Sequence, residues 1–213
     1  MGNLILVRHA TTAASASGRN LGQADDPPLA PEGAVLAEAL SATLAAELSE
    51  LAHDELRLLT SPASRCRQTA APIASRLGIA DAAIEVHPGL LEIDYGTWDG
   101  LTAEECRARD PELRRQWEAD PFETRCPGGE SGADVARRSF AVFDPLDSWL
   151  AAERSRAAIV VAHNHVNRVR LCALIGWPMR EYRDRLSQDP GGYSIVGFGA
   201  GRPVIRRVNA AAT

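Results

Sequence analysis

The strongest constraint on the fold is a short apolar run near the amino terminus that ends in two polar residues. Leu4 to Val7 are four consecutive branched apolar residues, and Arg8 and His9 follow them directly. Such a run is typical of a parallel strand buried on both faces, and ligands bind just beyond the carboxyl ends of such strands. A histidine at this position can act as a nucleophile, but it can also simply hydrogen-bond a backbone carbonyl.

Two further apolar runs, at residues 56–59 and 157–162, also precede polar residues. The second is followed directly by the His-Asn-His sequence of residues 163–165. Because the carboxyl ends of parallel strands meet at one edge of a sheet, these polar residues are expected to lie near His9. The remaining strands are expected at residues 85–88, 193–198 and 204–208, the last two as a hairpin.

Apolar residues at helical spacing lie between these strands. Pro31 is expected to open a helix whose apolar face contains Leu36, Leu40, Leu44, Leu48 and Leu51. Further helices are expected over residues 133–152, which Pro145 should bend or divide, and over residues 166–175. The alternation predicts an α/β fold, a three-layer α/β/α sandwich with a mostly parallel central sheet. A polar helix over residues 102–118 is expected within a small helical cap at about residues 102–126, and residues 1–213 are expected to form a single domain.

Arg65 is the cation best placed to bind an anion beside the second strand. Thr60, Ser61 and Pro62 end that strand, and we expect Ser61 to cap the next helix with Pro62 at its first position. Helix amino termini attract anions, and a guanidinium group matches phosphate oxygens. Arg65 lies one turn into this helix and should point inward, whereas Arg67 is by default a solvated surface residue.

Residues 90–100 form a loop that sets two carboxylates, Glu92 and Asp94, among Leu, Ile, Tyr and Trp. Apolar surroundings disfavour the charged form of a carboxyl group, which is how a general acid is kept protonated near neutral pH. A loop carboxylate can equally be a cap or a solvated charge, so this pattern alone leaves the role open.

Composition excludes several classes of function. The net charge of −5 provides no basic field for nucleic acid or an anionic membrane. All 23 basic residues are Arg, which excludes Schiff-base chemistry and a Walker-type lysine. We recognise no export signal or membrane span, and the 4 Cys are scattered without C-x-x-C spacing. We therefore expect a cytoplasmic protein with reduced thiols and without nucleic-acid or membrane partners; a homodimer stays open.

Four motifs then follow one another along nearly the whole chain. They are residues 6–12 (LVRHATT, with Gly18-Arg19, Gly22 and Pro28-Leu29 after them), 61–70 (SPASRCRQTA), 91–100 (LEIDYGTWDG) and 161–163 (VAH). In this order they resemble the histidine phosphatase superfamily, which contains cofactor-dependent phosphoglycerate mutases and many phosphatases. Each motif is weak by itself, whereas the ordered set is specific.

The resemblance implies a catalytic set of His9, Glu92, Arg8, Arg65 and His163. His9 would attack phosphorus and form a phosphohistidine, while Glu92 would protonate the leaving oxygen and then deprotonate the attacking water. Arg8, Arg65 and a protonated His163 would hold the phosphoryl oxygens and stabilise their charge. With this positive charge present, neither a metal ion nor another cofactor is expected, and the partner is a small phosphorylated substrate.

Five residues are further candidates for substrate binding: Ser15, Arg19, Gly22, Asn164 and His165. Asn164-His165 replaces the Gly-Gly common after the late histidine of the family, and Asn tolerates the backbone angles that Gly adopts. His165 either contacts substrate or lies on the surface, and Arg19 either faces substrate or supports its loop. The H-x-H spacing lacks a carboxylate cluster, so it does not indicate a metal site.

The resemblance leaves three activities to compare. A phosphomonoesterase is favoured because only a modest segment separates Glu92 from the Pro-Gly-Gly-Glu-Ser run at residues 127–131, whereas mutases carry a longer insertion. Arg114-Arg115 faintly resembles an arginine pair of mutases, in different surroundings. A non-catalytic phospho-ligand-binding relative is disfavoured because every expected catalytic position is filled. No residue identifies the physiological substrate.

Overall fold

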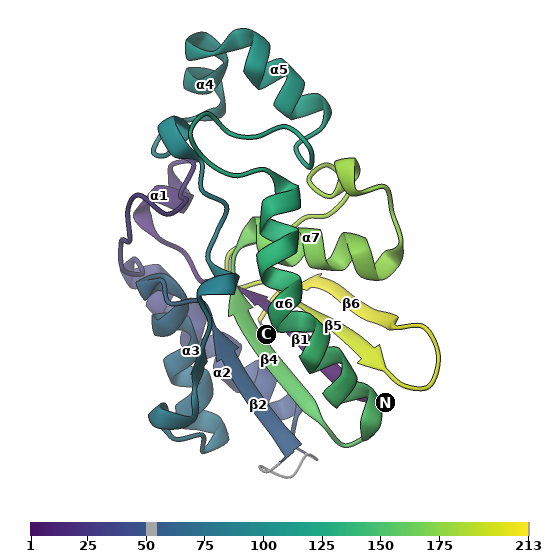
Figure 1. The fold of residues 1–213 in the computed structure, drawn as a ribbon. Coiled ribbons are helices and arrows are strands. Elements are labelled where there is room, and N and C mark those ends of the chain that lie inside the picture. Colours follow the sequence, from purple (N-terminus) through teal and green to yellow (C-terminus); the bar gives the residue numbers. More distant parts are fainter. Residues whose placement is uncertain (50–54, 213) are drawn as a thin grey trace.

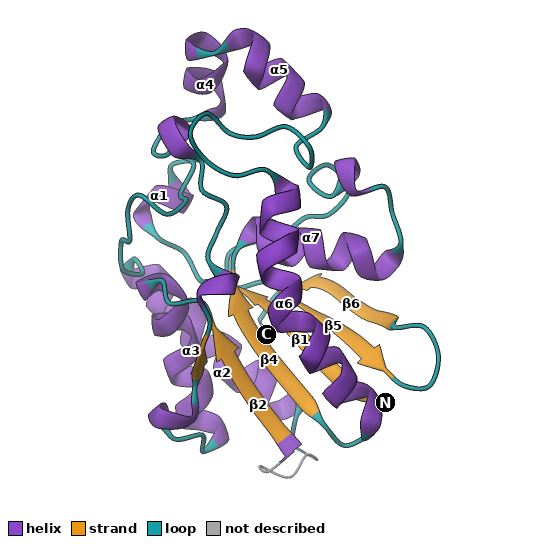
Figure 2. Cartoon of the chain, in the orientation of Figure 1, coloured by secondary structure: helices purple, strands orange, loops and turns teal. Residues whose placement is uncertain are grey.

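A six-stranded sheet lies at the centre of the computed structural model, which describes residues 1–49 and 55–212 (Figures 1 and 2). Its order is β3-β2-β4-β1-β5-β6. Neighbours from β3 to β1 pair in parallel, and β5 and β6 add an antiparallel hairpin at one edge. The bounds are β1 (Gly2–Arg8), β2 (Leu56–Thr60), β3 (Glu85–Val86), β4 (Ala157–Ala162), β5 (Tyr193–Phe198) and β6 (Val204–Ala210). The strand expected at residues 85–88 is shorter because Pro88 opens a 3-10 turn.

Side chains of the central strands alternate between two buried faces. Leu4 and Leu6 of β1 belong to one apolar core, and Ile5 and Val7 belong to the other. The first core is covered by α6 (Gly132–Ala152) and α7 (Asn164–Ile175), and the second by α2 (Pro31–Glu47) and α3 (Ser64–Leu77). The expected α/β/α sandwich is therefore confirmed. No helix within the described ranges is long and apolar enough to cross a membrane.

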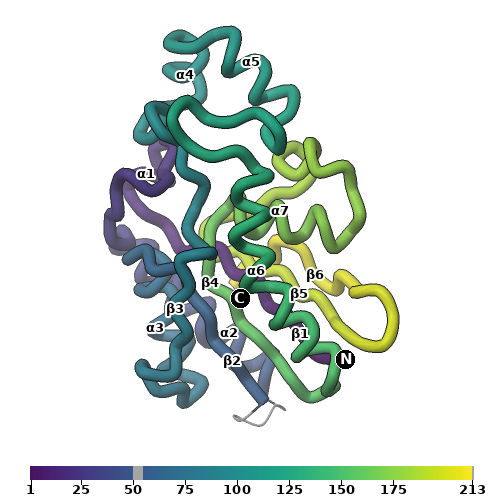
Figure 3. The backbone as a smooth tube through the Cα atoms, in the orientation of Figure 1, coloured from purple at the N-terminus to yellow at the C-terminus, as the bar shows by residue number. Residues whose placement is uncertain are grey.

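The cap consists of two helices and not of the single helix expected over residues 102–118. α4 (Ala103–Arg109) and α5 (Pro111–Ala119) lie together at the top of Figure 1, beyond the carboxyl ends of the strands. Pro111 disfavours a helical conformation at Asp110, so the first helix ends there. Figure 3 shows the segment around α1 (Ala13–Ala16) beside the cap, where the backbones of Asn20, Gly100 and Leu101 exchange hydrogen bonds.

Several local expectations need correction. Ser61 does not cap α3: the helix begins at Ser64 after Ala63, which makes no side-chain cap. α6 continues through Pro145 and is not divided there. Residues 13–16 form the one-turn α1, a helix not predicted from the sequence, because Thr12 and Ser15 build a capping box. In α2, Leu40, Leu44 and Leu48 are buried as expected, Leu36 is half-buried, and Leu51 lies outside the described residues. The 3-10 turns are η2 (Asp81–Ala83), η3 (Pro88–Leu90), η4 (Gly96–Trp98) and η5 (Met179–Glu181).

The sheet brings three strand ends together. β4 lies between β1 and β2, with Arg8 paired to Ala162 and Thr60 paired to Val161. The residues that directly follow these three strands therefore lie at the same edge of the sheet. They are His9, Ser61 and His163. The backbone N–H of His9 donates to Ala162 (3.0 Å) and that of Ser61 donates to Val161 (3.0 Å), which fixes this edge.

Candidate active site

His9 has a fixed and neutral imidazole ring. Its Nδ1 donates to the carbonyl oxygen of Ala10 at 2.8 Å, so the lone pair is on Nε2. Burial, followed by the charges of Arg8 and Arg65, lowers the pKa of His9 to about 3. The loop after it is held by Thr69, whose hydroxyl accepts from the backbone N–H of Ala10 at 3.0 Å. These contacts leave a nucleophilic nitrogen beside two cations.

The half-buried Arg8 and the buried Arg65 lie beside His9 with guanidinium groups that are only partly paired. Arg8 donates to the backbone carbonyl of Gln188, and Arg65 donates to that of Gly22 at 2.9 Å. The carboxylate of Asp26 lies 3.5 Å from Arg65 and is half exposed. The Nε atoms of both arginines are buried and have no hydrogen-bond partner among the described residues. Since unpartnered buried donors cost free energy, a bound anion would satisfy them.

His163 lies against His9, with ring centroids 5.2 Å apart in an edge-to-face arrangement. Its Nε2 is 2.9 Å from the hydroxyl oxygen of Ser61 and 3.4 Å from the sulfur of Cys66. Burial, reinforced by Arg65, lowers the pKa of His163 well below its ordinary value. Its ring is therefore neutral when no anion is bound.

Glu92 is a buried carboxyl group at the amino-terminal end of α7. Burial raises its pKa, and hydrogen bonds from the N–H groups of Ile93 (2.9 Å) and His165 (3.2 Å) oppose that rise. The charges of Arg65 and Arg8 oppose it further. A carboxyl group balanced in this way can give up a proton and take one back, as a general acid and base must.

Arg138 on α6 holds the backbone of the loop that carries Glu92. It donates to the carbonyls of Gly89 (2.9 Å), Leu91 (2.6 Å) and Glu92 (2.9 Å). It also pairs with both carboxylate oxygens of Glu130, the acidic residue of the Pro-Gly-Gly-Glu-Ser run. This side chain therefore positions the general-acid candidate without touching the pocket.

His165 has a buried side chain between two tyrosines. Its ring nitrogens are hydrogen-bonded to the hydroxyls of Tyr95 (2.8 Å) and Tyr182 (2.7 Å). Burial lowers the pKa of His165 well below its ordinary value, and a neutral ring supplies the one donor and one acceptor that these hydroxyls need. The side chain is not on the surface, and its backbone N–H reaches Glu92.

A polar pocket of about 320 Å³ opens in front of His9. Of the substrate-binding candidates, Ser15, Arg19, Asn164 and His165 line it; so do Arg8, Glu92, Gly18, Asn20, Leu21, Tyr95, Arg168 and Arg183. The hydroxyl of Ser15 is engaged in the cap of α1. Arg19 donates to Glu105 (2.9 Å) and to the carbonyl of Gly100 (2.7 Å), so it ties its loop to the cap.

Gly22 lies outside that pocket, on the side of Arg65. Its carbonyl accepts from Arg65, and a Cβ at this position would come within 2.7 Å of the Asp99 carboxylate and 2.8 Å of the Ile93 carbonyl. The close approach explains why glycine fits here.

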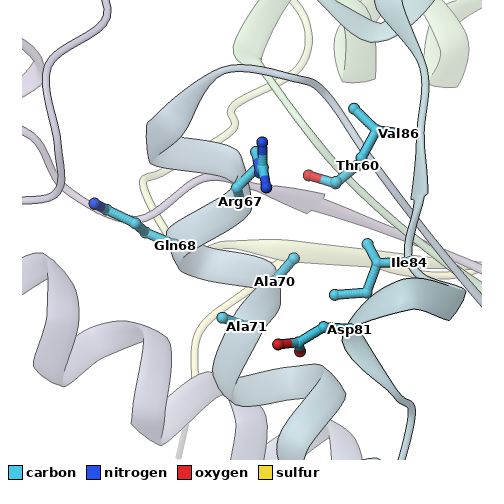
Figure 4. Close-up of a pocket in the computed structure, with 8 residues that line it drawn as sticks. All are labelled: Thr60, Arg67, Gln68, Ala70, Ala71, Asp81, Ile84 and Val86. Carbon is cyan, nitrogen blue, oxygen red and sulfur yellow. The ribbon is translucent and has the colours of Figure 1, made fainter.

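A second pocket, of about 270 Å³, lies behind α3 (Figure 4). Its charged residues are Arg67 and Asp81, and Ala70, Ala71 and Ile84 supply much of its wall. Arg67 therefore lines a different pocket from His9. Of the phosphate-binding candidates, Arg8 lines the first pocket, whereas Arg65 lines a further pocket of about 210 Å³ together with Gly22 and Asp26. His163 joins the site through the contact of its ring with that of His9.

No group of three His, Cys, Asp or Glu side chains in the described parts of the chain is arranged to hold a metal ion. His163 and His165 face separate partners, Ser61 and the two tyrosines. The site therefore favours a bound anion over a bound cation.

The sequence did not indicate that Ser61 is a partner of His163. It also did not indicate four further residues at or near the site: Arg138, Tyr95, Arg168 and Arg183. Ser61 directly follows an apolar strand, which was a usable signal. The others become neighbours only through tertiary packing. Arg138 lies on α6, Tyr95 on the loop of residues 90–100 that carries Glu92 (the acid loop), Arg168 on α7 and Arg183 after it.

The chain matches the family described as the histidine phosphatase superfamily (branch 1) over residues 4–211. Phosphoserine phosphatase 1 of Hydrogenobacter thermophilus is 30% identical over 210 residues, which cover 98% of this chain and 92% of that protein. Glucosyl-3-phosphoglycerate phosphatase of Mycolicibacterium vanbaalenii is 31% identical over 180 residues, 83% of this chain and 75% of that protein. A solved mycobacterial glucosyl-3-phosphoglycerate phosphatase superposes with a TM-score of 0.81 at 26% identity, covering 99% of this chain and 100% of that chain.

The chain belongs to the histidine phosphatase superfamily. The expected enzyme class, a phosphoric monoester hydrolase, is confirmed at the level of the family.

Proposed function

We propose that the protein is a metal-independent phosphomonoesterase that acts on a small phosphorylated metabolite through a phosphohistidine on His9. The observation that carries this proposal is the neutral His9 ring, with Nδ1 bound to Ala10 and two guanidinium groups beside it. A nucleophile with a free lone pair next to unsatisfied anion-binding donors suits attack on a phosphoryl group.

The reaction proceeds in two displacements. In the first, the lone pair on Nε2 of His9 forms a bond to phosphorus, the ester P–O bond breaks, and protonated Glu92 gives its proton to the leaving oxygen. In the second, Glu92 takes a proton from water, the water oxygen bonds to phosphorus, and the N–P bond breaks to release inorganic phosphate. Arg8, Arg65 and His163 hold the non-bridging oxygens in both steps.

Bound phosphate also explains how His163 can contribute charge. The pKa of the empty-site ring is lowered by burial and Arg65, and a phosphoryl dianion next to it would favour its protonated form. The ring would then donate to a phosphoryl oxygen while Ser61 holds its other side. This contribution therefore depends on substrate being present.

A phosphoglycerate mutase is the alternative, and two arginines of the cap argue against it. Arg114 is buried in the cap, pairs with Glu118 at 3.0 Å and stacks on Trp117. Arg115 is exposed and pairs with Glu112 at 2.7 Å. Neither lines the pocket, so this pair does not supply charge for a retained bisphosphate.

Hydrolysis of p-nitrophenyl phosphate, with and without a chelator, tests the proposal. We expect turnover that is unchanged by the chelator and lost by at least about 1,000-fold in His9→Ala, as for removal of an essential nucleophile. Turnover that depends on an added metal ion, or that survives in His9→Ala, would contradict it. If the wild type transfers phosphate between phosphoglycerates but hydrolyses no ester, the mutase is the correct function.

A further inference from the structure

The pocket contains more positive charge than one phosphoryl group requires. Among its described lining residues, four are arginines (Arg8, Arg19, Arg168 and Arg183), and the one acidic residue is Glu92. Arg8 lies next to His9, and Arg19 is neutralised by the cap. Two cations, Arg168 and Arg183, thus remain without an assigned role.

Arg168 is a cation of this pocket that no carboxylate of the described residues contacts. It lies on α7, one turn after Asn164, and within residues 1–49 and 55–212 its side chain has no hydrogen-bond or ion-pair partner. Arg8, Arg168 and Arg183 line the same pocket. Burial lowers the pKa of Arg168 and repulsion from Arg8 and Arg183 lowers it further, while Tyr95 and Glu92 oppose that change. A guanidinium group stays charged at neutral pH even so, and leaving this half-buried group without a bound anion costs free energy.

Arg183 is placed by an aromatic ring and only weakly by an acid. Its guanidinium carbon is 4.8 Å from the centroid of the Trp117 ring, a cation–π contact. The carboxylate of Asp184, 3.9 Å away, is exposed and therefore strongly screened. Arg183 and Arg168 together supply this pocket with two cations besides Arg8.

The volume of about 320 Å³ is near the small end of the range for small-molecule sites. We propose that Arg168 and Arg183 bind a second anionic group of the substrate, a carboxylate, so that the preferred substrates are phosphorylated short-chain carboxylic acids. This assignment rests on the proposed phosphatase activity at His9. Its physical basis is that an Arg guanidinium binds a carboxylate through two parallel hydrogen bonds.

Two matched pairs of substrates test the inference on the wild-type protein. The first pair is 3-phosphoglycerate and glycerol 3-phosphate, and the second is phosphoserine and phosphoethanolamine; in each pair only one member carries the carboxylate. We expect kcat/KM to be higher for the carboxylated member by about tenfold or more, the effect of one charge-assisted hydrogen bond. Equal values in both pairs, with turnover intact, would overturn the inference and leave the phosphatase proposal standing. Absence of any turnover, including that of p-nitrophenyl phosphate, would overturn the phosphatase proposal itself.

Variants then assign the preference to residues. We expect Arg168→Gln and Arg183→Gln each to lower the ratio of kcat/KM within a pair, and the double variant to bring it close to one. Arg180→Gln is the matched control, because Arg180 is exposed, lies three residues before Arg183 and does not line the pocket. A carboxylate preference that persists in a folded double variant, with folding verified by circular dichroism, would refute the assignment to these arginines.

Discussion

At the scale of single residues, two buried titratable groups have opposite shifts that suit opposite tasks. Burial lowers the pKa of His9 to about 3, which keeps its lone pair available, and raises the pKa of Glu92, which favours its protonated form. The same physical cause acts on both, since burial disfavours whichever form is charged. A nucleophile and an acid are thereby prepared in one pocket.

The raised pKa of Glu92 predicts a specific pH dependence. The first step needs the protonated carboxyl group, so kcat/KM for an alkyl phosphate should fall as pH rises through the folded-state pKa, above the ordinary 4.5. In Glu92→Gln we expect this alkaline decrease to disappear and kcat to fall by about 100- to 10,000-fold. Formation of the phosphohistidine from p-nitrophenyl phosphate should be affected much less, because its leaving group needs no proton. Steady-state pH profiles and single-turnover measurements of the two esters check this.

Asp94 provides the matched control for that experiment. It belongs to the same loop, but its carboxylate accepts from the N–H of Gly96 at 2.8 Å and does not line the pocket. Asp94→Asn should keep the pH profile of the wild type. A pH profile that changes in Asp94→Asn and not in Glu92→Gln would show that Asp94, and not Glu92, is the general acid.

At the scale of elements, the acid loop is irregular and depends on a helix for its shape. Arg138 of α6 donates to three of its carbonyls and pairs with Glu130, which in turn accepts from the N–H of Asp94 at 3.0 Å. Gln23 adds a donor to the carbonyl of Glu92 at 2.7 Å. The part of the loop that carries Glu92 lies between the turns η3 and η4, and side chains from distant parts of the sequence fix it there.

Replacing Arg138 should therefore impair catalysis through position. We expect Arg138→Met to lower kcat by about 10- to 100-fold with a small change in KM, because a misplaced acid slows chemistry more than binding. Arg137→Met is the control: Arg137 is adjacent, largely exposed and paired with Asp134 instead. A loss carried mainly by KM, or an equal loss in Arg137→Met, would show that Arg138 does not position Glu92. Comparing kcat and KM with an alkyl phosphate measures the difference.

At the scale of the whole molecule, strand periodicity was sufficient to place His9, Arg8 and His163. Apolar runs that end in polar residues predict parallel strands, and parallel strands align their carboxyl ends. The contact between Ser61 and His163 could not be predicted in the same way, because it depends on the register of β2 against β4. The break between the two cap helices could have been predicted from Pro111, because the residue before a proline disfavours a helical conformation.

Arg138, Arg168 and Arg183 illustrate a different limit of the sequence. A chain whose basic residues are all arginine offers many equivalent candidates, and only packing separates a positioning cation from a solvated one. The family membership supplies the class of reaction, whereas the two further pocket cations, Arg168 and Arg183, supply the inference about substrate.

The central claim is that phosphate passes through a bond to His9, and direct detection of that bond is the most informative measurement. Glu92→Gln mixed with p-nitrophenyl phosphate should accumulate the intermediate, because attack by water lacks its base. After an alkaline quench and proteolysis, mass spectrometry should find a phosphate on the peptide that contains His9, stable in alkali and labile in acid. Phosphate on His163, on His165 or on no residue, despite release of p-nitrophenol, would contradict the account.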